Sequence, residues 1–200
     1  KRGSPIKIRL VKGANLGMEA VESSLHNWYP ATFDSKLESD ANFKKMLKYA
    51  MENTEHVHIG VGSHNIFDIA YAMVLRKETG NEAFVNFEML SGMAEALQRV
   101  VAKMTGKMVL YAPQAEEKDF EHAVSYLIRR LEENGGEENF LRAFFSLSKE
   151  EIWTKQAEKF QKACAFEPSA VSRRLKAPPK ENEPDLDFSL PQTRELALKA

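Results

Sequence analysis

The sequence has little that would support a disulfide framework, a membrane span or the binding of nucleic acid. Cys164 is the only cysteine in 200 residues, which excludes an internal disulfide and a metal cluster built from cysteines. The formal net charge is −1, so no excess of positive charge is present to neutralise phosphates. No apolar run approaches the roughly 20 residues that cross a bilayer, and no signal-peptide pattern is visible. We therefore expect a cytoplasmic protein in which this segment binds no nucleic acid.

What the sequence does contain is enough apolar material for a core, because 43% of the residues are hydrophobic and 10% are aromatic. Short runs rich in β-branched residues alternate with stretches of helical spacing. The runs predict strands at 6–11, 56–61, 83–90 and 108–111. The stretches between and after them predict helices at 16–27, from Ser39 to Ala50, from Ile66 to Val74, up to Thr105, around Arg129 and over 137–165.

Four strand–helix units in series predict a parallel sheet with helical crossovers. No Gly-x-Gly-x-x-Gly turn follows any of the four strands, which disfavours an open doubly wound dinucleotide-binding sheet. A (β/α)8 barrel is the preferred architecture, and four units make half of one. Since the sequence starts at Lys1 without a methionine, we expect the other half to precede it.

The composition changes near residue 168, where apolar side chains become scarce. Residues 176–184 are rich in proline and charge, as is typical of a linker. We therefore predict a first unit over residues 1–167 and a linker leading into another domain over residues 168–200.

Two adjacent arginines, Arg129 and Arg130, stand inside the helix expected after the last strand. Guanidinium groups offer planar donors matched to a carboxylate, so the pair is a candidate trap for a small acid. Tyr126 lies three positions before Arg129 and four before Arg130. Glu133 lies one turn beyond Arg129, where a carboxylate can orient a guanidinium. The alternative is a solvated basic patch with no ligand.

Other candidate residues follow the ends of the strands. Lys12 comes directly after the first strand, where a Schiff-base lysine of an aldolase-like barrel is an alternative role. His56 and His58 alternate along the second strand with the spacing of a zinc pair, but the sequence places no third ligand near them. We predict no metal site.

Five motifs, in this order, resemble the second half of the proline dehydrogenase domain, in the form found in bifunctional bacterial proline utilisation proteins. They are Arg9-Leu10-Val11-Lys12-Gly13-Ala14, Ser63-His64-Asn65, Glu88-Met89-Leu90-Ser91-Gly92-Met93, Tyr111-Ala112-Pro113 and residues 126–134. The resemblance covers residues 5–150 and implies strands five to eight of a distorted (β/α)8 barrel that binds FAD at the carboxyl ends of its strands.

On the cofactor side, the resemblance implies that Arg9 lies against the flavin ring, where a cation stabilises the reduced ring. The residues implied to bind FAD are Arg9, Val11, Lys12, Gly13, Ala14, Lys36, His64, Asn65 and Glu133. Asn15 departs from the family pattern, because an aromatic residue is frequent at this place.

On the substrate side, the resemblance implies that Arg129 and Arg130 hold the carboxylate of L-proline. Tyr111 and Tyr126 would close the pocket, and Leu10 and Leu90 would form its apolar walls. The implied reaction is oxidation of L-proline to 1-pyrroline-5-carboxylate by hydride transfer to flavin N5, with Arg9 and Tyr111 as the catalytic residues.

The resemblance also implies partners outside this segment. They are a quinone or another electron acceptor, a following NAD-dependent glutamate semialdehyde (aldehyde) dehydrogenase domain, further copies of the chain in a homo-oligomer, and peripheral contact with a membrane. The alternative is a non-catalytic segment between domains, with the activity located in the downstream dehydrogenase.

Overall fold

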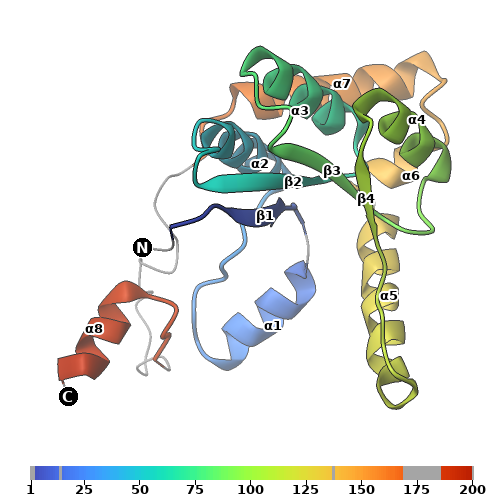
Figure 1. Ribbon diagram of the computed structural model, residues 1–200. Helices are drawn as coiled ribbons and strands as arrows, with labels where there is room; N and C mark the ends of the chain where they lie inside the picture. Colours follow the sequence, from blue (N-terminus) through green and yellow to red (C-terminus); the bar gives the residue numbers. More distant parts are fainter. Residues whose placement is uncertain (1–2, 14, 137, 169–185, 200) are drawn as a thin grey trace.

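The computed structural model describes residues 3–13, 15–136, 138–168 and 186–199, in which strands and helices alternate along the chain (Figure 1). The elements of the sheet layer are β1 (Ile6–Leu10), α1 (Leu16–Leu25), α2 (Lys36–Met51), β2 (Val57–Gly62), α3 (Ile66–Glu78), β3 (Val85–Leu90), α4 (Glu95–Thr105) and β4 (Met108–Tyr111). They are followed by a short 3-10 helix η1 (Glu117–Asp119), α5 (Phe120–Gly135), α6 (Phe140–Phe144), α7 (Glu150–Ala165) and α8 (Pro191–Lys199). Most of the predicted linker, residues 169–185, lies outside the described residues.

The four strands form one parallel sheet in the order β1-β2-β3-β4. Arg9 pairs with Gly60, Gly62 pairs with Glu88, and Leu90 pairs with Tyr111. Because strand order follows chain order and every pair is parallel, each connection is a crossover that brings the chain back to the end of the sheet where the preceding strand began. The predicted parallel α/β sheet is confirmed.

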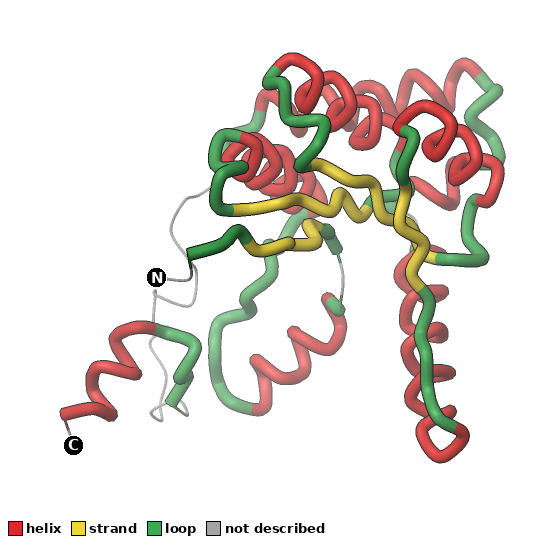
Figure 2. Tube along the Cα trace, in the orientation of Figure 1, coloured by secondary structure: helices red, strands yellow, loops and turns green. Residues whose placement is uncertain are grey.

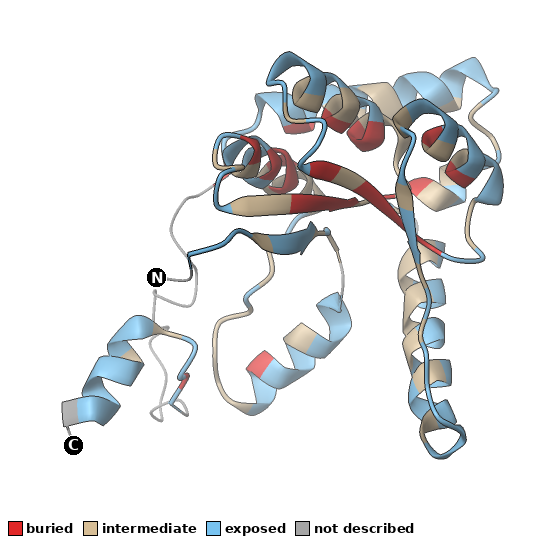
Figure 3. Ribbon diagram, in the orientation of Figure 1, coloured by how far each residue is buried: buried red, intermediate tan, exposed pale blue. Residues whose placement is uncertain are grey.

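One face of this sheet carries the hydrophobic core. Side chains alternate between the two faces of a strand, and those of Ile59, Val61, Phe87 and Met89 point toward the helices. Figure 1 shows α2, α3 and α4 on this side of the sheet, and Figure 3 shows buried residues gathered between the sheet and these helices. The cluster also includes Phe43, Leu47, Met51, Ile69, Ala72, Val85 and Val101.

The other face of the sheet is polar and lies on the side of α1 and α5, which extend away from the strands (Figure 2). It carries Arg9 of β1, Gly60 of β2, Glu88 of β3 and Tyr111 of β4, because residues paired across parallel strands share a face. The two faces thus separate a dry core from a charged surface.

No helix among the described residues is long and apolar enough to cross a membrane.

The helix boundaries differ from the sequence prediction in one instructive place. α2 begins at Lys36, three residues before the predicted Ser39. Ser35 caps it, because its hydroxyl accepts a hydrogen bond from the Glu38 backbone N–H at 3.2 Å while the Glu38 carboxylate accepts one from the Ser35 N–H. The reciprocal capping box outweighs the weaker signal at Ser39.

The helical stretch expected over 137–165 consists of two helices, α6 and α7, and it packs on the body of the domain as expected. Trp153 and Phe160 of α7 lie 5.0 and 5.8 Å from Phe67 of α3, measured between ring centres. These aromatic contacts hold α7 against the outer side of the helix layer.

We predict that Leu47→Ala lowers the free energy of unfolding by about 2–5 kcal/mol, because Leu47 is fully buried and the substitution leaves a cavity. Met46, its neighbour on α2, is 44% exposed, so Met46→Ala should cost less than about 1 kcal/mol. Urea unfolding of both variants measures the difference. Equal losses would show that the core does not lie where α2 meets the sheet.

Candidate active site

The polar face of the sheet centres on Glu88, which is 2% exposed. One of its carboxylate oxygens lies 2.8 Å from Lys7 Nζ, and the other accepts a hydrogen bond from Arg9 Nε. Gly60 makes room for this carboxylate, since a Cβ there would lie 2.5 Å from Glu88 Cδ. Sequence reasoning gave Glu88 no role. An acidic residue between Phe87 and Met89 in the middle of β3 was the available signal.

The two cations keep Glu88 ionised. Burial alone raises the pKa of this carboxyl, but the hydrogen bonds from Lys7 and Arg9 outweigh it and hold the pKa below its ordinary value. Glu88 is therefore a fixed negative charge beside two basic side chains that remain about half exposed.

Arg9 also stacks on Tyr111, with its guanidinium carbon 4.3 Å from the centre of the ring. Burial raises the pKa of Tyr111, and so does the neighbouring Tyr126, while the charges of Arg9 and Arg130 act in the opposite direction. Tyr111 thus lies within electrostatic reach of residues from β1 and α5. Leu90 is 2% exposed and pairs with Tyr111 in the sheet, so the two residues lie side by side on the same face.

Arg130 lies in α5 and connects this helix to the loop after β1. Its Nη2 donates to Asn15 Oδ1 at 2.6 Å and to Glu133 Oε1 at 2.8 Å, and its guanidinium lies 5.4 Å from the ring centre of Tyr126. The backbone N–H of Asn15 donates to the same Glu133 oxygen at 2.7 Å. Asn15 has a left-handed φ of 58°, a conformation that asparagine tolerates better than an aromatic residue does.

The arginine pair retains unused donors. The Nε atoms of Arg129 and Arg130 are buried and have no hydrogen-bond partner among the described residues. A buried donor without a partner costs free energy, so an acceptor from outside the described part of the chain would be stabilised there.

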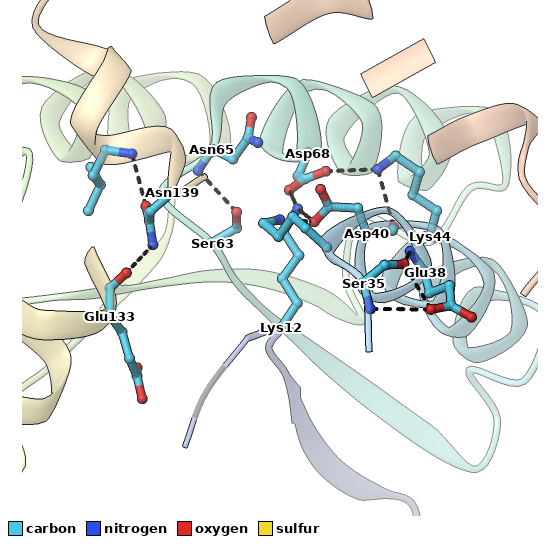
Figure 4. A network of polar contacts seen from close by, with 12 residues as sticks. Lys12, Ser35, Glu38, Asp40, Lys44, Ser63, Asn65, Asp68, Glu133 and Asn139 are labelled. Atoms are coloured by element: carbon cyan, nitrogen blue, oxygen red, sulfur yellow. Dashed lines mark hydrogen bonds and ion pairs between the residues drawn. The ribbon is translucent and has the colours of Figure 1, made fainter. Parts of the chain in front are cut away.

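A second group of charges lies at the carboxyl edge of the sheet, between the loop after β1 and the first turns of α2 and α3 (Figure 4). Lys12 Nζ lies 2.5 Å from Asp40 Oδ1 and 2.6 Å from Asp68 Oδ2. Lys36 pairs with Asp40, and Lys44 lies 3.3 Å from Asp68. Three lysines and two aspartates leave this group with one net positive charge.

The charge states in this group follow from burial and pairing. Burial lowers the pKa of Lys12, but Asp68 and Asp40 raise it further, so the net shift is upward and Lys12 stays a cation. A Schiff-base lysine needs a lowered pKa, so the structure argues against that alternative. Burial and the charge of Lys12 together lower the pKa of Lys36.

His64 follows β2 and is half-buried. Burial lowers the pKa of its imidazole, although a hydrogen bond with the backbone of Leu90 acts in the opposite direction. Its Nε2 is buried with no partner in the described part of the chain. Asn65 caps α3, because its side-chain oxygen accepts a hydrogen bond from the Phe67 N–H at 2.9 Å.

One of the predicted site residues stands apart from the others that the structure describes. Leu10 lies on the opposite face of the sheet from Arg9 and packs against the core, so the structure does not group it with Leu90 and Tyr111 as a pocket wall. The alternation of side chains along β1 is the reason. Val11 is 44% exposed, and its side chain lies beside Gly62 on the same side of the sheet as Arg9. Ala14 lies outside the described residues.

The model of the proline dehydrogenase family matches residues 1–143. The chain belongs to the proline dehydrogenase family. Its fold is similar to that of proline utilization A (PutA) from Corynebacterium freiburgense, with 41% identity and a TM-score of 0.80 over 98% of this chain and 19% of that one. PutA from Bdellovibrio bacteriovorus, inactivated by N-propargylglycine, is 34% identical with a TM-score of 0.76 over 99% of this chain and 20% of that one.

A mutant PutA from Bradyrhizobium japonicum has 23% identity and a TM-score of 0.60 over 98% of this chain and 20% of that one, which extends the likeness in fold. No curated protein sequence matches the chain. The chain spans about a fifth of the length of these structures. Its mixed α/β structure with four parallel strands matches the proline dehydrogenase domain, a TIM-barrel-like fold, as the sequence led us to expect.

We predict that Asp40 contributes stability that is lost in acid. Although burial raises the pKa of Asp40, Lys12 and Lys36 lower it below its ordinary value. The contribution is therefore complete above a pH of about 4 and disappears as the pH falls through the lower folded pKa. Asp40→Asn should be less stable than the parent protein at pH 7 and should lose less on acidification.

Thermal unfolding between pH 7 and pH 3 measures this difference. Glu95→Gln serves as the control, because Glu95 forms an exposed ion pair with Arg99 at 3.2 Å and should leave the acid dependence unchanged. An Asp40→Asn profile parallel to that of the parent protein would contradict the assignment.

Proposed function

We propose that this chain supplies part of the active site of a proline dehydrogenase, which oxidises L-proline to 1-pyrroline-5-carboxylate with FAD as the hydride acceptor. The observation that carries the proposal is the convergence of Arg9, Tyr111, Tyr126 and Arg130 from three elements. The Nε atoms of Arg129 and Arg130 have no hydrogen-bond partner in the part of the chain that the structure describes. This combination offers cations for a carboxylate next to aromatic and apolar surface for a small ring.

The residues at the carboxyl edge fit FAD. Among the described residues, the buried Nε2 of His64 has no hydrogen-bond partner, and the lysine group carries one net positive charge. These groups suit the polar and anionic parts of a dinucleotide. Gly13 has a φ of 72°, and no atom of the described residues lies within 4 Å of the place of a Cβ, so a ligand can approach its backbone. The residues that would hold FAD are Arg9, Val11, Lys12, Gly13, Ala14, Lys36, His64, Asn65 and Glu133. Bound FAD supplies the electron-accepting ring.

The chain's own residues bind and orient the substrate. Arg129 and Arg130 hold the carboxylate, and Leu90 and Tyr111 fix the position of the ring. The raised pKa of Tyr111 keeps its hydroxyl protonated at neutral pH, so this residue positions the substrate and does not act as a base. Arg9 would lie against the bound flavin, where its positive charge would stabilise the reduced ring. Positioning and charge are thus the main contributions of this segment.

The partners proposed for the whole protein extend beyond this segment. Similar structures are about five times as long as this chain, and one is described as a bifunctional proline utilization A protein. We therefore propose a following NAD-dependent aldehyde dehydrogenase domain, with residues 168–200 leading into it. A quinone or another electron acceptor would reoxidise the flavin. Homo-oligomer formation and peripheral membrane contact remain predictions of the family resemblance.

We predict that Arg129→Met and Arg130→Met each raise the KM for proline by about tenfold or more with little loss of FAD, because each removes a charge-assisted contact to the carboxylate. Pyrrolidine has no carboxylate, so its KM should change much less. Arg99→Met on the exposed surface of α4 is the matched control and should change neither value.

Steady-state kinetics of the full-length protein on both substrates decides between the alternatives. Equal losses on proline and pyrrolidine would indicate a folding role for the pair. An unchanged KM for proline would favour a solvated basic patch.

A further inference from the structure

We propose that Glu88 is the positioning residue and counter-ion of Arg9, holding the guanidinium on Tyr111 and limiting the net positive charge beside the reacting ring. The inference rests on the proposed function, because it assigns a role toward the site in which Arg9 would act. Glu88 itself acts through Arg9.

Glu88 contacts β1 through both of its carboxylate oxygens. Lys7 and Arg9 stand two residues apart on the same face of that strand, and each bonds a different carboxylate oxygen. Arg9 therefore has two constraints, the Glu88 carboxylate at Nε and the Tyr111 ring at its face. Two contacts at different parts of a planar group fix its orientation more tightly than either alone.

Gly60 provides independent support. It lies between Arg9 and Glu88 in the sheet, paired with Arg9, and the Glu88 side chain crosses the space that a Cβ would occupy. The φ of Gly60 is not in the left-handed region, so backbone conformation does not require glycine here. Room for the carboxylate is the steric reason for a glycine at this position.

The charges of Lys7, Arg9 and Glu88 determine whether a substitution raises or lowers the reduction potential of the flavin. Lys7, Arg9 and Glu88 together carry one net positive charge, and replacing Glu88 by glutamine would leave two. A more positive surrounding favours the reduced flavin, so Glu88→Gln should raise its reduction potential. Arg9→Met removes a positive charge and should lower the potential. Opposite shifts from two residues in contact distinguish an electrostatic role from general damage to the fold.

The orientation of the Arg9 guanidinium by Glu88 leads to a second prediction, which can be tested separately. Glu88→Gln retains an oxygen that can accept from Arg9, whereas Glu88→Leu retains none. We expect Glu88→Leu to slow flavin reduction by proline about tenfold. The KM for proline should stay within about twofold, because the substrate's carboxylate is held by Arg129 and Arg130 and not by Arg9. Glu88→Gln should keep most of the rate.

The experiment is a redox titration and stopped-flow reduction of the full-length, FAD-containing protein and its Glu88→Gln, Glu88→Leu, Arg9→Met and Lys7→Met variants. Lys7→Met is the matched control, because Lys7 bonds Glu88 without a described contact to Tyr111. It should lower the potential less than Arg9→Met and leave the reduction rate nearly unchanged. Gly60→Ala should displace the carboxylate and reproduce the slow reduction of Glu88→Leu even if the latter fails to fold.

The outcomes separate the two proposals. If Arg9→Met leaves the potential unchanged, Arg9 does not lie at the flavin and the proposed function loses this residue. If Arg9→Met lowers the potential but Glu88→Gln does not raise it, the proposed function stands and the role of Glu88 is wrong. Reduction by the Gly60→Ala variant at the parent rate would likewise overturn the positioning role.

Discussion

The alternation of side chains along four parallel strands is the constraint on which the rest of the structure depends. It sends Ile59, Phe87 and Met89 into the core and places Arg9, Glu88 and Tyr111 together on the opposite face. A shift of one residue in any strand would exchange these sets. The hydrophobic core therefore fixes the register, and the register in turn determines which polar residues can meet.

Glu88 and Asp68 are buried acids that are each surrounded by cations. Glu88 lies between Lys7 and Arg9 on the face of the sheet, and Asp68 lies between Lys12 and Lys44 at its edge. Burying an unpaired carboxylate costs several kcal/mol, so removing one partner should disturb the other. Basic residues are thereby held in place where the proposed cofactor and substrate would bind. Order in the site comes from fixed ion pairs as much as from the backbone.

Much of this arrangement could be predicted from local patterns. The four strands lie within two residues of their predicted positions, because β-branched runs and their breaks are written in the sequence itself. The Arg129-Arg130 doublet and the polar residues after each strand were also visible as motifs. What the motifs could not supply was pairing between distant residues, such as Arg9 with Glu88, which are 79 positions apart.

One difference from the sequence prediction has a clear physical cause. The helix α2 begins three residues before Ser39, because Ser35 and Glu38 form a reciprocal capping box that a single cap at Ser39 does not match. Leu10 packs on the opposite face of β1 from Arg9, so its role as a pocket wall stays a prediction. In both cases the geometry of an element, more than the type of residue, decides the position.

The most direct test of the account is a crystal structure of the full-length protein with FAD and a five-membered-ring carboxylate that cannot be oxidised. We expect the ligand's carboxylate to contact Arg129 and Arg130, its ring to lie between Leu90 and the flavin, and Arg9 to remain stacked on Tyr111. A ligand bound away from the arginine pair, or an Arg9 turned away from both Tyr111 and the flavin, would contradict it.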